Sequence, residues 1–161
     1  MSMQAKKLLT PEEYLALERA AEFRSEYHNG EMLAMAGGTE AHTMLVDNLI
    51  SQLHLRLRGG PCRAYSNNMR VKIGAAGSYL YPHVVIACGE RQFLDDRRDT
   101  LLNPIVIMEV PSECAEAYDR GKKFGYYRSL ESLQEYVVVS ADRVQVESYR
   151  RQPEGAAHRL Q

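Results

Sequence analysis

Cysteine, net charge and long apolar runs are all scarce in this 161-residue sequence. Its three cysteines, Cys62, Cys88 and Cys114, are an odd number without the spacing of a metal site, so we expect them to be reduced and structural. A net charge of -1 excludes a strongly basic protein that coats nucleic acid, although a local basic patch is still allowed. No apolar run approaches the roughly 18 residues of a membrane span, and the N-terminal stretch is too short and polar for a signal peptide. These absences predict a cytoplasmic protein without a membrane segment.

What the sequence does contain is the composition of an ordinary folded protein, with 45% apolar and 25% charged residues. The length allows a sizeable core, and we find no repeat, low-complexity segment or interdomain linker. We therefore expect a single domain over residues 1–161, frayed at its N- and C-terminal ends.

Local motifs predict two helices and a hairpin in the first third of the chain. Residues 10–13, Thr-Pro-Glu-Glu, form a capping box and predict a helix to about Ala21. Asn29-Gly30 predicts a tight turn between two short strands. Thr39 can cap a long helix from about Glu40 to Arg58, whose apolar residues recur at helical spacing.

Most of the remaining chain is predicted to form β-strands. Strands are expected at 62–66, 69–73, 79–88, 105–110, 135–140 and 144–149, and a helix at 116–129. The charged segment 89–104 is expected to be a solvated loop that pairs its own charges. This order predicts an α/β or α+β fold in which a sheet is flanked by helices.

The predicted strand Ile105–Val110, IVIMEV, contains one charged residue, Glu109. A buried carboxylate is energetically costly unless a cation or a hydrogen-bond donor lies beside it. Neighbouring strands can place His83 beside it, and the following helix can bring Lys123 over the same place. Carboxylate and imidazole can bind a divalent cation, and a lysine can stabilise charge on a phosphate oxygen. The pattern is weak by spacing alone. The ordinary alternatives are a Glu109–Lys123 salt bridge and a helix ion pair between Lys123 and Asp119.

Six stretches together resemble the Uma-type restriction endonuclease family of the PD-(D/E)XK nuclease superfamily. They are SEYHNGEMLAMAG, EAH, YPHVVIACGE, DDRRDTLLNPIVIMEV, EAYDRGKKFGYYRSL and LQEYVVVSADRVQVESYRR. The resemblance as a whole runs from about Thr10 to Arg151. The resemblance implies a restriction endonuclease-like mixed sheet flanked by helices. It also implies hydrolysis of DNA phosphodiester bonds with a divalent metal, Mg or Mn. A homodimer is expected, because cutting both strands usually needs two sites.

By this resemblance, Glu109 is a catalytic residue and metal ligand, and His83 occupies the position of the second metal ligand. Lys123 matches the catalytic lysine that has moved to the following helix, 123 − 109 = 14 residues after Glu109. Glu31 matches an acidic hairpin residue that lines the same site, and His42 matches a histidine near the start of the long helix. The ordinary alternatives are that Glu26 and Glu31, on the two arms of the hairpin, are both solvated carboxylates and that His42 is a packed or capping group.

The sequence departs from the family where it matters most for metal binding. His83 stands where an aspartate is expected, and Asn68 where related sequences often have one. A neutral imidazole brings no negative charge and suits manganese or zinc better than magnesium. The protein is therefore either a metal-dependent endonuclease or a catalytically impaired nuclease fold that binds nucleic acid or a partner. A direct Glu109–Lys123 contact in a dry, closed pocket would favour the impaired alternative.

Seven basic residues could form a surface that contacts phosphates: Arg56, Arg58, Arg63, Arg70, Lys72, Arg120 and Lys122. The ordinary alternative is that they are scattered surface charges balanced by acidic residues.

Overall fold

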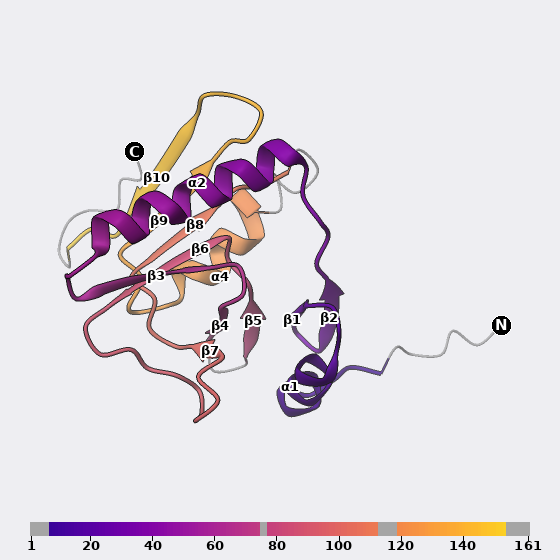
Figure 1. The fold of residues 1–161 in the computed structure, drawn as a ribbon. Coiled ribbons are helices and arrows are strands. Elements are labelled where there is room, and N and C mark those ends of the chain that lie inside the picture. Colours follow the sequence, from indigo (N-terminus) through magenta and orange to yellow (C-terminus); the bar gives the residue numbers. More distant parts are fainter. Residues whose placement is uncertain (1–6, 75–76, 113–118, 154–161) are drawn as a thin grey trace.

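The computed structural model describes residues 7–74, 77–112 and 119–153 (Figure 1). The elements are α1 (Pro11–Ala20), β1 (Ser25–His28), β2 (Glu31–Ala34), α2 (Glu40–Leu57), β3 (Cys62–Ser66), β4 (Arg70–Ile73), β5 (Ser78–Leu80), β6 (Val84–Cys88), β7 (Thr100–Leu101), β8 (Val106–Glu109), the π-helical turn η1 (Asp119–Lys123), α4 (Phe124–Arg128), β9 (Glu135–Val139) and β10 (Val146–Arg150). The predicted start of the helix at 116 and Cys114 lie outside the described residues. No helix in the described ranges is long and apolar enough to cross a membrane.

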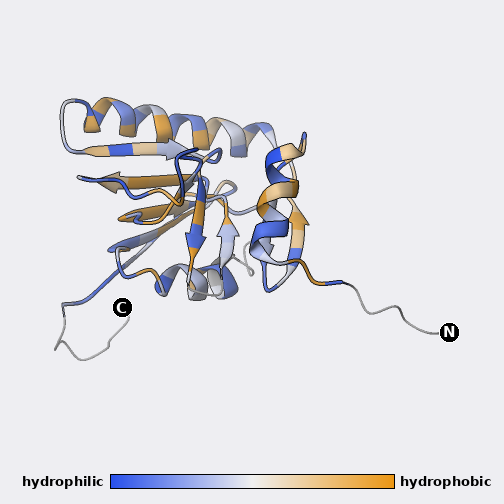
Figure 2. Cartoon of the chain, turned by 90° about the horizontal axis from the view of Figure 1, so that it is seen from below, coloured by the Kyte–Doolittle hydropathy of each residue, from blue (hydrophilic) through white to orange (hydrophobic). Residues whose placement is uncertain are grey.

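The strands form two mixed sheets of five. The first has the order β2-β1-β5-β4-β7 and the second β10-β9-β8-β6-β3. In the second sheet, β8 is central, antiparallel to β6 and parallel to β9. Figures 1 and 2 show the long helix α2 on one face of this sheet and α4 on the other, with the apolar strands between them. A strand covered on both faces needs the apolar composition that IVIMEV has.

Alternate residues of β9 show which face each helix covers. Val138 packs in the same core cluster as Tyr127 of α4. Val137 and Val139 pack with Val46 of α2. Because successive side chains of a strand point to opposite faces, this alternation fixes the two helices on opposite sides of the sheet.

The N-terminal helix and hairpin form as their local motifs predict. The Thr10 hydroxyl accepts from the Glu13 backbone N–H (3.2 Å), and the Glu13 carboxylate accepts from the Thr10 N–H (2.9 Å). The hairpin turns at Asn29 and Gly30, both at positive φ (47° and 87°), which glycine and asparagine tolerate best. Tyr27 of β1 pairs with β5, so the hairpin is joined to the first sheet.

The predicted strand over 79–88 is in fact two strands that belong to different sheets. β5 ends at Leu80 and β6 begins at Val84, with Pro82 between them. Proline has no backbone N–H to donate to a sheet, so the chain changes sheets there. This crossing sets where β6 begins, and with it the position of His83.

The expectation of reduced cysteines is wrong for Cys62 and Cys88, which form a disulfide. The antiparallel register of β3 and β6 places the two residues directly opposite each other. That register joins residues 26 positions apart, and the cysteine spacing alone gave no indication of it.

The charged loop does not pair its own charges. The Asp99 carboxylate accepts two bonds from the Arg19 guanidinium of α1, both 2.9 Å, and lies 3.1 Å from Arg70 Nη2. Asp95 accepts from Arg19 as well (2.9 Å). These contacts clamp the loop to α1. Because Arg70 is 3% exposed, it cannot belong to a phosphate-contacting surface.

Candidate active site

Glu109, His83 and Lys123 come together at one end of the second sheet. β6 and β8 pair with Val84 opposite Met108, so the next position in the same register puts His83 opposite Glu109. Paired residues of an antiparallel ladder share a face, which brings the imidazole and the carboxylate into contact. Lys123 ends the turn η1, just before α4 covers the same face.

Glu109 is fully buried and its carboxylate has three partners. Oε1 accepts a hydrogen bond from the Tyr127 hydroxyl (2.8 Å) and lies 3.6 Å from Lys123 Nζ. Oε2 contacts His83 Nδ1. Burial alone would raise the pKa of Glu109, but the charge of Lys123 and then the His83 hydrogen bond outweigh it and lower the pKa to about 2. The carboxylate is therefore ionised although water does not reach it.

Glu26 is a second buried carboxylate at this site. Its Oε1 lies 3.3 Å from Lys123 Nζ and accepts the backbone N–H of Tyr81 at 3.0 Å. Lys123 is only 7% exposed and lies within ion-pair distance of both Glu26 and Glu109. The lysine therefore balances two negative charges.

Glu31, the hairpin carboxylate predicted for the site, begins β2, and its role in the site stays a prediction. It is exposed and pairs with His28 beside the turn. The alternative that both hairpin glutamates are solvated agrees with the exposure of Glu31 but is wrong for Glu26, which is buried. A sequence signal that separates them is hard to find, because both are glutamates next to apolar residues of short strands. β1 lies between β2 and β5, whereas β2 is an edge, and this difference buries Glu26.

His42 also reaches the site. It lies in the first turn of α2, where its backbone N–H donates to the Thr39 hydroxyl (3.3 Å). Its Nε2 is 3.1 Å from His83 Nε2, so a line of contacts runs from His42 through His83 to Glu109. Burial and then the neighbouring His83 lower the pKa of His42, which favours its neutral form. The backbone nitrogen of Val110 also lies 3.1 Å from His83 Nδ1. The tautomer of His83 decides whether Nδ1 accepts from Val110 or donates to Glu109.

The chemistry of these donors decides which metal they could hold. In residues 7–74, 77–112 and 119–153, no group of three or more His, Cys, Asp or Glu side chains is arranged as a metal site. Magnesium favours an octahedron of oxygens, whereas the side chains in contact here are the Glu109 carboxylate and two imidazoles, with the Glu26 carboxylate on the far side of Lys123. That set does not fit magnesium. A carboxylate oxygen with an imidazole nitrogen suits manganese or zinc.

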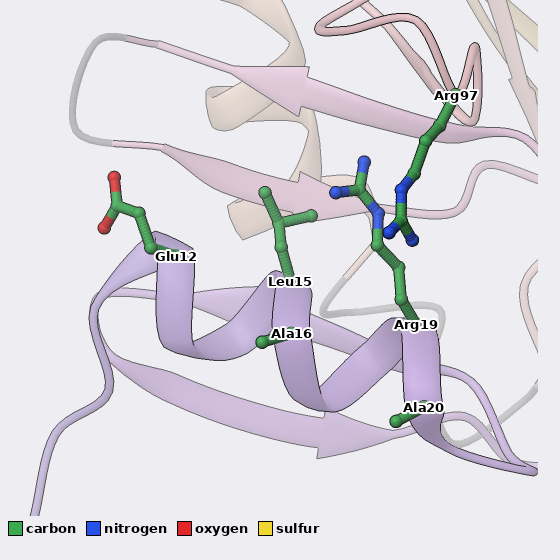
Figure 3. Close-up of a pocket in the computed structure, with 6 residues that line it drawn as sticks. All are labelled: Glu12, Leu15, Ala16, Arg19, Ala20 and Arg97. Atoms are coloured by element: carbon green, nitrogen blue, oxygen red, sulfur yellow. The ribbon is translucent and has the colours of Figure 1, made fainter.

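A separate pocket of about 580 Å³ lies along α1, away from this chemistry (Figure 3). Arg19 and Arg97 lie toward one end of it and Glu12 toward the other, with Leu15 between them. Its lining includes none of the residues around Glu109. Arg19 is already held by Asp95 and Asp99, so we assign this pocket no part in the site.

Comparison with known proteins identifies the family. The family model Uma2, described as "Putative restriction endonuclease", matches residues 11–161. The chain belongs to the Uma2 family. Two uncharacterised proteins of Synechocystis sp. are each 34% identical to this member, over 94% and 91% of its chain and 85% and 76% of their own. The family resemblance seen in the sequence is confirmed.

A solved structure confirms the fold. It is described as a "putative nuclease belonging to DUF820" from Anabaena variabilis, and matches with a TM-score of 0.72 at 19% identity. The match covers 91% of this Uma2 chain and 82% of the other. The predicted restriction endonuclease-like fold is therefore confirmed, with the strands divided between two mixed sheets where one was expected.

Proposed function

We propose that this Uma2 protein is a metal-dependent endonuclease that hydrolyses phosphodiester bonds of DNA. The observation that carries the proposal is the gathering of Glu109, His83 and Lys123 at one end of the second sheet, in a protein of a restriction endonuclease family. Burial of an ion pair needs good geometry to offset desolvation, so it is a poor device for stability alone. A role in the site is therefore a better reason for the buried Glu109–Lys123 pair than stability.

The residues would divide the work as follows. Glu109 and His83 would hold a divalent ion of the manganese type, which would supply Lewis-acid activation of a phosphate oxygen or a water. Lys123 would stabilise negative charge that develops on the phosphate. Tyr127 orients Glu109 through its hydroxyl (2.8 Å), and Glu26 holds the lysine in place (3.3 Å). Glu31 stays a candidate at the edge of the hairpin.

A second candidate function is a catalytically impaired nuclease fold that binds nucleic acid without cutting it. One observation favours it: Glu109 is 0% exposed and already in contact with Lys123. This is the closed arrangement expected of an impaired site. A metal could reach Glu109 only after His83 or Lys123 moved.

The two functions are separated by plasmid cleavage with magnesium and with manganese. Wild type, His83→Asp and Glu109→Gln are compared, and Glu109→Gln serves as the inactive control. Cleavage by the wild type supports the endonuclease and refutes the impaired candidate. Cleavage by His83→Asp alone supports the impaired candidate. No metal-dependent nicking by either protein sinks the endonuclease proposal.

DNA as substrate, a homodimer and a cytoplasmic location complete the proposal. A dimer would supply the second site needed to cut both strands. Light scattering of the purified protein checks the dimer, for which the expected mass is twice the 18.3 kDa of one chain.

A further inference from the structure

A basic pocket lies at the other end of the second sheet from Glu109. It has a volume of about 370 Å³ and is bounded by the end of α2, the start of β3 and the segment after β6. Three arginines line it, Arg58, Arg63 and Arg91, together with His54 and Tyr65. Within the described part of the chain, no Asp or Glu contributes to the lining. The pocket is therefore a concentration of positive charge in a protein whose net charge is -1.

The described hydrogen bonds of these arginines leave donors for a ligand. Arg63 donates through Nη1 to the carbonyls of Gly60 and Cys62, both at 2.9 Å. Those bonds fix the Arg63 guanidinium against the turn between α2 and β3. Arg91 donates through Nη1 to the Tyr65 hydroxyl (3.2 Å). A guanidinium has five N–H donors in a fork that matches phosphate oxygens, so each bonded arginine keeps further donors.

A disulfide and a backbone hydrogen bond hold the walls of the pocket together. The Cys62–Cys88 disulfide joins the first residue of β3 to the last residue of β6. The Gly89 N–H donates to the Pro61 carbonyl at 3.0 Å. Arg63 follows one side of these links and Arg91 the other, so both guanidinium groups extend from backbone that is fixed before a ligand arrives. Such preorganisation lowers the entropy lost on binding.

We propose that this arginine pocket, made by Arg58, Arg63 and Arg91, binds a backbone phosphate of DNA. The proposal rests on the proposed function in taking DNA as the ligand. The pocket is a phosphate-contacting site separate from the reacting centre, and it adds affinity without reading base sequence. Of the basic residues singled out in the sequence, it uses Arg58 and Arg63, and it adds Arg91 from the charged loop.

The test is DNA binding measured by fluorescence anisotropy with a labelled 30-base-pair duplex in EDTA, where no cleavage occurs. Wild type is compared with Arg58→Ala/Arg91→Ala and with Arg63→Ala over a range of salt. Each lost phosphate contact is expected to lower the slope of log K against log salt by about 0.9. Because the pocket holds one phosphate, the double variant should lose about 0.9 from the slope. Arg56→Ala, on the same helix but outside the pocket, is the matched control and should keep the wild-type slope.

The outcomes are distinct from those of the cleavage assay. Equal affinity and slope for wild type and the double variant overturn the proposal, as does a wild type that binds no duplex, or an equal loss in Arg56→Ala. A lower slope in the pocket variants supports it even if no protein cleaves DNA. Arg91→Lys keeps the charge and should keep most of the slope, which separates a charge effect from a folding defect. Circular dichroism checks that each variant is folded.

Discussion

Replacing Lys123 with methionine tests whether this lysine balances the charges at the buried site. In Lys123→Met the carboxylates of Glu26 and Glu109 would lose a cation that lies 3.3 and 3.6 Å away. Coulomb's law with an effective dielectric constant of about 20 gives about 5 kcal/mol for the 3.6 Å pair. Removing one partner of a buried ion pair costs about 3–5 kcal/mol in measured cases. We therefore expect a loss of about 3–5 kcal/mol in the free energy of unfolding at pH 7.

The same variant has a predictable dependence on pH. In the wild type the pKa of Glu109 is lowered from 4.5 to about 2, with Lys123 as the largest stabilising cause. The stabilisation is fully present above pH 4.5 and is lost as the pH falls toward 2. Without the lysine, Glu109 takes up a proton at higher pH. The difference in stability between variant and wild type should therefore be largest near neutral pH and shrink as the solution is acidified.

Urea unfolding and thermal melts measure the effect. At about 2–4 °C per kcal/mol for a chain of this size, the melting temperature should fall by roughly 6–20 °C. Lys122→Met is the matched control, because the neighbouring lysine is exposed. A double-mutant cycle with Glu109→Gln isolates the pair. If Lys123→Met and Lys122→Met are equally stable, or if the loss does not depend on pH, the lysine is not the counter-charge of Glu109.

Three further perturbations test other contacts. Tyr127→Phe removes the 2.8 Å hydrogen bond to Glu109 and should cost about 1.5–3 kcal/mol in urea unfolding at pH 7; an unchanged midpoint would contradict the assigned bond. Cys62→Ser/Cys88→Ser should lose about 2–4 kcal/mol, and a reductant should destabilise the wild type but leave this variant unaffected. The pKa of Asp99 is lowered to about 2, first by the hydrogen bond from an α1 arginine, so its contribution is present above pH 3.8 and lost toward pH 2. Because the carboxylate is 36% exposed, Asp99→Asn should cost at most about 1 kcal/mol near pH 7 and nothing below pH 2, and a penalty that persists in acid would show another cause.

Features fixed by neighbouring residues were predictable from the sequence. The capping box at Thr10, the turn at Asn29-Gly30 and the start of α2 at Glu40 each depend on a few adjacent side chains, and each formed where expected. The sequence also pointed to Glu109 as a candidate site residue, because a single carboxylate in an apolar strand is unusual. Its contact with His83 followed once the two strands were assumed to be neighbours.

Features fixed by the pairing of distant strands were not predictable. The disulfide needs the register of β3 against β6, and the separation of β5 from β6 needs knowledge that they belong to two sheets. Glu26 became a site residue only because β5 pairs beside β1 and the Tyr81 N–H then meets its carboxylate. Arg19 and Asp99, 80 positions apart, illustrate the same limit for surface charge.

Under the proposed function, the length of β6 would set the length of DNA needed to reach both the Glu109 site and the arginine pocket. His83 precedes this buried five-residue strand and Cys88 ends it, so the strand acts as a rigid spacer of about 17 Å between the reacting centre and the arginine pocket. Phosphates of one strand of a duplex repeat every 3.4 Å along the axis, so the spacer corresponds to about five base pairs. A duplex that ends closer than this to the bond being cut would lose its contact with the arginines. A duplex lying along β6 would then bind more weakly at its ends than in its interior, whatever its base sequence.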